Sequence, residues 1–257
     1  MSEPGQPESS GTPARRAFLR GALGAGLVGA AAAGYVYRSP SASAAEVTAE
    51  AAELGMLPAV PFHGRYQAGI LPKPQRQTAV VSFNVTATGR GELTELFRTL
   101  TDRARFLTAG GTPPLVGITA PPSDSGVLGP TVIPDGLTVT VGVGASLFDG
   151  RYGLASLRPA GLTAMRPFPD DSLDPAQCGG DLSVQLSAGN ADTVLHALRD
   201  IARNTRGGMQ VLWRIDGFTS PPRPAGTTPR NLLGFMDGIA NPSVNSATAM
   251  EDRKSVV

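Results

Sequence analysis

Asp237 is the residue of this sequence whose surroundings best suit it for chemistry. It lies in residues 231–242, which read NLLGFMDGIANP, and it stands between Gly234 and Gly238. Glycine lets the backbone turn tightly and approach a ligand closely, and a carboxylate can accept and return a proton. The stretch therefore predicts a loop that presents one acid/base group to a bound molecule. The Asp-Gly and Asn-Pro pairs are equally typical of two consecutive turns without a chemical role.

The other residues capable of chemistry stand alone. His63 lies in a glycine-containing loop and His196 in a helical pattern, and no second ligand occurs at a paired spacing, so both are interpreted as surface or hydrogen-bonded histidines. Cys178 is the only cysteine and cannot form an intramolecular disulfide. Arg223 and Arg230 precede the loop and are interpreted as solvated side chains. We therefore predict no metal site built from these residues.

Six segments with strand or helix patterns precede the loop and must position it. Strands are predicted at 77–85, 137–143, 181–187 and 209–214, and amphipathic helices at 91–106 and 191–203. The arginines at 98, 103 and 105 are assigned to the solvent face of the first helix. The order strand, helix, strand, strand, helix, strand predicts an α+β, ferredoxin-like fold, in which an antiparallel sheet carries helices on one face.

The composition excludes one class of partner. The chain has 257 residues, 41% of them hydrophobic, and a formal net charge of +1. No basic stripe interleaved with aromatic residues occurs, so the sequence predicts no nucleic-acid partner. The 32 glycines and 23 prolines indicate many connections between elements.

Residues 1–44 look like a twin-arginine export signal. An arginine pair at 15–16 precedes an alanine- and glycine-rich run at 21–34, and Ala-Ser-Ala at 42–44 offers a cleavage site. The run is too short and too rich in glycine for a stable membrane span, which needs about 20 apolar residues. A permanent anchor is the alternative. We expect export to the periplasm or the cell exterior.

The loop at 231–242 resembles, over its whole length, the distal-side motif of the dye-decolorizing haem peroxidases, whose signature is Gly-x-x-Asp-Gly. Further matches lie at 62–70, 137–149, 168–174, 179–185 and 213–218. They extend the resemblance over nearly all of residues 58–242, toward the exported bacterial deferrochelatase/peroxidase branch. One departure is Tyr66, where the family often has histidine.

This resemblance implies a cofactor, a reaction and site residues. The cofactor would be haem b, and the partners would be hydrogen peroxide and a small organic substrate, with deferrochelatase-like handling of haem and iron. Asp237 would be the acid/base catalyst of O–O bond cleavage. Gly238, Ile239 and Ala240 correspond to residues that line the haem in relatives.

The resemblance also implies a domain organisation, with the ferredoxin-like fold as the first half of a two-half peroxidase fold. The expected parts are a signal at 1–44, a short helix or flexible lead-in at 45–57, the ferredoxin-like N-terminal domain at 58–220, and at 221–257 a linker, the motif loop and the start of a truncated second domain.

In the family, the proximal histidine and the distal arginine follow the motif, and this chain stops before either. Neither His63 nor His196 matches the ligand. The alternative function is therefore a non-catalytic, truncated ferredoxin-like fragment, and a third hypothesis is a homo-oligomer that rebuilds a cavity between two chains. The sheet face meant for a second half is expected to be apolar and to favour association.

Overall fold

The computed structural model describes residues 44–71, 73–117, 119–220, 223–224, 227–228, 230–236 and 245–248. Its helices are α1 (Ala44–Glu53), α2 (Arg90–Ala109) and α3 (Ala191–Asn204), and its strands are β1 (Gln77–Val85), β2 (Thr138–Val143), β3 (Leu182–Ala188) and β4 (Met209–Phe218). Three short 3-10 helices, η1 (Ala145–Phe148), η2 (Ala155–Leu157) and η3 (Pro175–Gln177), lie in the connection from β2 to β3. In these ranges no helix is both long and apolar enough to cross a membrane.

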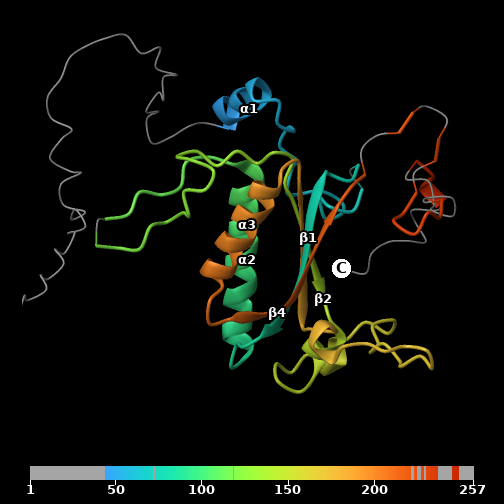
Figure 1. Ribbon diagram of the computed structural model, residues 1–257. Coiled ribbons are helices and arrows are strands. Elements are labelled where there is room, and N and C mark those ends of the chain that lie inside the picture. The colour runs from blue at the N-terminus through green and yellow to red at the C-terminus, as the bar shows by residue number, and fades with distance from the viewer. Residues whose placement is uncertain are drawn as a thin grey trace, which may run out of the picture. The chain divides into compact units, whose positions relative to one another are not determined.

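The four strands form one antiparallel sheet in the order β2-β3-β1-β4. Each helical crossover skips one strand, because β3 lies between β1 and β2, and β1 lies between β3 and β4. Helices α2 and α3 lie side by side on one face of the sheet (Figure 1). The predicted ferredoxin-like α+β fold is confirmed.

The core lies between this sheet face and the two helices. Alternate residues of the central strands are buried there, including Val81 and Phe83 of β1 and Val184 of β3, and they meet Leu100 of α2 and Ile201 of α3. Burial of one such side chain stabilises the fold by about 1.5–3 kcal/mol. Apolar residues recur every two positions in the predicted strands and about every 3.6 positions in the predicted helices. Both sets of residues therefore pack into one shared core.

Two elements extend three or more residues beyond their predicted ends. Helix α2 continues to Ala109 and stops because Gly110 adopts a φ of 73°, with its N–H bonded to the Phe106 carbonyl. Strand β4 continues to Phe218, which pairs with Gln77. Residues 215–218 show little alternation of their own, and their strand conformation comes from pairing with β1.

Arg103 corrects one prediction about α2. Its side chain is 19% exposed and forms an ion pair with Asp200 of α3, which is 4% exposed. The solvent-face interpretation is therefore wrong for Arg103, although it describes Arg98, whose side chain is 68% exposed. The pairing partner lies on another helix, so nothing in the local pattern distinguishes the two arginines.

The second face of the sheet also differs from the prediction. Over β2, β3 and β1 it carries mainly hydroxyl and amide side chains, and Thr78 Oγ1 lies 2.8 Å from Ser187 Oγ across β1 and β3. Apolar groups concentrate on β4, where Ile215 is 57% exposed. The expectation of an apolar second face is wrong for three of the four strands, because their polar positions alternate with the core positions.

Candidate functional site

The first half of the motif loop folds upon itself. The Asn231 N–H donates to the Phe235 carbonyl at 3.0 Å, and Arg230 and Met236 form an isolated bridge. Asn231 Oδ1 accepts the N–H groups of Leu233 at 3.0 Å and Phe235 at 3.1 Å. One asparagine thereby satisfies several backbone groups, which is the reason for an Asx-type turn here.

Arg230 and Gly234 close the same turn. Arg230 Nη1 donates to the Gly234 carbonyl at 2.7 Å, and Gly234 has a φ of 86°, a left-handed conformation that favours glycine. Arg230 is exposed, as predicted, and in addition it bonds the loop backbone. Arg223 is exposed, as predicted.

The turn directs its apolar side chains outward. Leu232 is 89% exposed, Leu233 82% and Phe235 67%. The loop is held by its own hydrogen bonds, and these side chains are left available to a partner surface or ligand.

The predicted catalytic and cofactor-binding residues follow directly in the sequence. Asp237, Gly238, Ile239 and Ala240 lie outside the described residues. Their roles stay predictions, because the last described residue of the loop is Met236, directly before Asp237.

Both histidines are engaged in hydrogen bonds. His196 is 1% exposed, and its Nε2 lies 2.7 Å from Asp124 Oδ2, which ties α3 to the connection between α2 and β2. His63 is exposed, and its Nε2 accepts a hydrogen bond from Arg105 Nε at 3.0 Å. The interpretation of both as hydrogen-bonded residues is confirmed.

The described residues do not fit an iron site. They contain no group of three or more His, Cys, Asp or Glu side chains that could hold a metal ion. The nitrogen Nε2 of each of the two histidines already has a protein partner. Cys178 is a free, half-buried thiol. Among the described residues, neither histidine therefore offers a free Nε2 to haem iron.

Arg151 is the centre of a polar cluster that sequence reasoning missed. Its guanidinium makes five hydrogen bonds, to the carboxylates of Asp149 and Asp181 and to the carbonyls of Val85 and Ser146. A guanidinium has five N–H donors, so none is left for a ligand. The cluster is structural, and its only signal in the sequence is Asp181, directly before β3.

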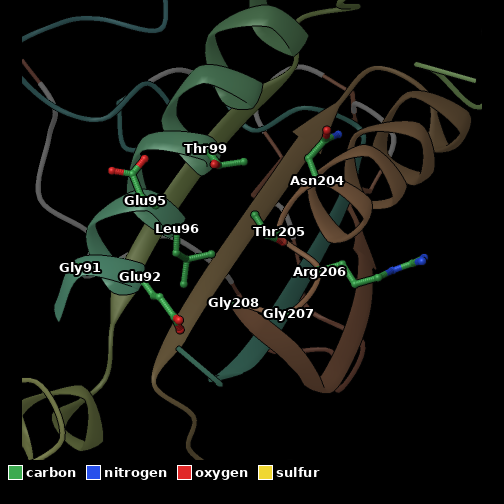
Figure 2. Close-up of a pocket in the computed structure, with 10 residues that line it drawn as sticks. All are labelled: Gly91, Glu92, Glu95, Leu96, Thr99, Asn204, Thr205, Arg206, Gly207 and Gly208. Carbon is green, nitrogen blue, oxygen red and sulfur yellow. The ribbon is translucent and has the colours of Figure 1, made fainter. Parts of the chain in front are cut away.

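A shallow cleft of about 370 Å³ lies between the start of α2 and the turn from α3 to β4. Its lining includes Glu92, Glu95, Leu96 and Arg206. Figure 2 shows Glu95 and Arg206 pointing away on opposite sides, and Glu92 Oε2 accepts the Thr88 N–H at 2.7 Å. Polar groups do not converge there, so the cleft lacks the arrangement expected of a binding site.

Comparisons with known proteins agree with the fold. The family described as Dyp-type peroxidase, N-terminal, matches residues 67–219. The deferrochelatase of Yersinia pestis bv. Antiqua (strain Nepal516) is 48% identical over 189 residues, covering 72% of this chain and 44% of that protein. The deferrochelatase of Escherichia coli O157:H7 is 42% identical over 243 residues, covering 93% of this chain and 56% of that protein. The chain thus spans about half the length of the curated relatives it matches.

Solved structures show the same relationship. A DyP-type peroxidase from Streptomyces coelicolor superposes with a TM-score of 0.63 at 35% identity, over 75% of this chain and 50% of that one. Ferric DtpA from Streptomyces lividans superposes with a TM-score of 0.64 at 34% identity, over 76% of this chain and 51% of that one. The family match covers more than half of the sequence, and the fold agrees with it. The chain belongs to the Dyp-type peroxidase family.

Proposed function

We propose that this chain functions as a haem-dependent peroxidase of the dye-decolorizing type. Such an enzyme reduces hydrogen peroxide while it oxidises a small organic substrate. The observation that carries this proposal is the motif loop, closed by Asn231, Arg230 and Gly234 immediately before Asp237. Relatives named deferrochelatase support handling of haem and its iron as part of the same activity.

In this proposal Asp237 acts as the acid/base group. Its carboxylate takes a proton from one oxygen of peroxide and returns it to the oxygen that leaves as water. Gly238, Ile239 and Ala240 would line the haem, which would supply the redox chemistry when bound. Because Nε2 of both histidines already has a protein partner, the proposal assigns to the described part of this chain only the side of the site that the motif loop forms.

We further propose that the twin-arginine segment directs export to the periplasm or the cell exterior. The arginine pair and the alanine- and glycine-rich run that follows it support this location. Export in the folded state would suit a protein that acquires its cofactor before leaving the cytoplasm.

The function is tested by titrating the chain with haem, recording the Soret band, and then adding peroxide and a dye. We expect haem uptake and dye turnover, with the axial ligand coming from outside the described residues. Asp237→Asn should retain the Soret band and lose turnover by about a hundredfold or more. Asp170→Asn, which changes an exposed carboxylate in the connection between β2 and β3, is the matched control and should leave turnover unchanged. Absence of haem uptake, or full turnover by Asp237→Asn, would overturn the proposal.

A further inference from the structure

The sheet has two edge strands, β2 and β4, which differ in whether their outward backbone groups are hydrogen-bonded. At the β2 edge, the Gln67 side-chain amide donates to the Val141 carbonyl at 2.9 Å and accepts the Val141 N–H at 2.7 Å. This pair of bonds occupies the backbone groups that a further strand would use. At the opposite edge lies β4, ten residues long.

The outward backbone groups of β4 can be identified from its pairing with β1. Thr219 N–H donates to the Arg76 carbonyl at 2.9 Å, so residue 219 directs its backbone groups toward β1. Successive residues of a strand alternate in this direction. The N–H and C=O groups of Arg214, Asp216 and Phe218 therefore point away from the sheet, and among the described residues no backbone group forms a hydrogen bond with them.

The side chains on this edge are exposed as well. Ile215 is 57% exposed and Phe218 is 65% exposed. Within the described residues the segment 214–218 therefore forms an open edge with apolar side chains, and such an edge is a template for pairing with another strand.

The charged side chains of β4 are complementary to those of a second copy of the same strand. Arg214 and Asp216 lie on one face, and Arg214 Nη2 is 2.7 Å from Asp216 Oδ1. If two β4 strands run antiparallel about a two-fold axis at Ile215, Arg214 of each copy faces Asp216 of the other. Opposite charges directly across an antiparallel pair stabilise it, and like charges destabilise it.

The same register satisfies the backbone. Residues 214 and 216 both have outward N–H and C=O groups, so the facing residues can exchange both hydrogen bonds. An axis at Arg214 or at Asp216 would instead place like charges opposite each other. Backbone direction and side-chain charge therefore favour one register.

We propose that β4 pairs with β4 of a second copy of this chain, antiparallel and centred on Ile215, to form one continuous sheet across a homodimer. The interaction is isologous, because each copy supplies the same surface. It does not depend on haem binding, so it stands or falls separately from the proposed peroxidase function.

Complementary charge variants of the full chain test this register. Arg214→Asp gives a strand with two acidic residues, and Asp216→Arg gives one with two basic residues. Sedimentation velocity should show a dimer for the unmodified chain and an increase of about tenfold or more in the dissociation constant of each variant alone. An equimolar mixture of the two variants should dimerise again, because every acidic residue then faces a basic one.

Two further variants complete the test. Ile215→Lys places two cations on the axis and should give a monomer, whereas Leu157→Lys changes an equally exposed apolar residue in η2 and should leave the dimer intact. Thermal unfolding of each variant verifies that the monomer fold persists. A monomeric unmodified chain, or single charge variants that dimerise as well as the unmodified chain, would falsify the pairing.

Discussion

Arg151 donates hydrogen bonds to both carboxylate oxygens of Asp181, from Nη2 to Oδ1 at 2.8 Å and from Nη1 to Oδ2 at 3.1 Å. The Val85 N–H also donates to Asp181 Oδ2, at 2.8 Å. Asp181 is buried immediately before β3, and Val85 ends β1. This cluster therefore anchors the long connection between β2 and β3 to the central strand of the sheet.

Asp181 should make the fold sensitive to acid. Burial raises the pKa of Asp181, but hydrogen bonds from Arg151 and Val85 outweigh burial and hold that pKa below its usual range. The stabilising contribution is therefore complete above the unfolded-state pKa, at about pH 4, and is lost as pH falls through the lower folded-state pKa.

Asp181→Asn should lower the free energy of unfolding at neutral pH by about 2 kcal/mol, because the Arg151 guanidinium loses its charged partner. It should also reduce the loss of stability below about pH 4. Urea unfolding followed by circular dichroism across the acid range measures both effects. Asp170→Asn serves as the exposed control, and an acid response of Asp181→Asn identical to that of the unmodified chain contradicts the prediction.

The pair Arg103 and Asp200 should show strong coupling between the two helices. Arg103 Nε and Nη2 donate to the two carboxylate oxygens of Asp200 at 2.7 Å and 2.8 Å. Removing one partner leaves a largely buried charge, so Arg103→Met and Asp200→Leu should each cost about 3 kcal/mol. The double variant should be closer to the unmodified chain than either single variant, because apolar side chains of similar volume replace the pair.

A double-mutant cycle measured by chemical unfolding provides this coupling energy. The exposed pair Arg98 and Glu95 on α2 is the control, and its coupling should be below about 1 kcal/mol. Additive single effects at Arg103 and Asp200 would show that the two side chains stabilise the fold independently.

The elements that sequence reasoning identified share a simple property: each buries one face. Thr138–Val143 alternates threonine and valine, and the valines at 139 and 141 face the helices while the threonines face the other side. The alternation of residue types therefore predicts which positions of the strand are buried. The second half of β4 lacks this signal, because its residues are exposed on both faces of the sheet and are held by pairing with β1.

The candidate site also has one part that the sequence predicted and one part that it did not. The motif at 231–242 indicated the family because many residues match in order, and that prediction is confirmed by the family match at 67–219. The Arg230 bond to Gly234 was not predictable from residue types, since an arginine can bond a carbonyl or water equally well. The partners of His196 and Arg103 lie 72 and 97 residues away in the sequence, so no local pattern indicates them.

Export should depend on the two arginines near the N-terminus. Replacing Arg15 and Arg16 together by lysine keeps the charge but removes the planar guanidinium groups, and the two side chains are not interchangeable in recognition. We expect the double variant to accumulate in the cytoplasm. Cell fractionation with immunoblotting measures the distribution, and Arg20→Lys is the matched control. Undiminished export of the double variant would rule out the twin-arginine route.

Asp135 and Gly189 should behave as one coupled unit. Asp135 is fully buried with a φ of 46°, and its carboxylate accepts the Leu57 N–H at 2.9 Å and the Asn190 Nδ2 at 2.8 Å. A Cβ on Gly189 would lie 2.8 Å from Asp135 Cγ. The carboxylate thus occupies the space that a side chain at residue 189 would need.

Gly189→Ala should therefore cost about 3 kcal/mol, because it displaces a buried, hydrogen-bonded carboxylate. Asp135→Gly should cost about 2 kcal/mol, since the lost hydrogen bonds outweigh the relief of a left-handed backbone. In the Asp135→Gly background, Gly189→Ala should cost about 1 kcal/mol or less, because the clashing carboxylate is gone. Chemical unfolding of the four proteins gives the coupling. Gly150→Ala, where an added Cβ meets nothing within 4 Å, should be nearly neutral. If the costs at 135 and 189 simply add, the carboxylate does not limit the space at Gly189.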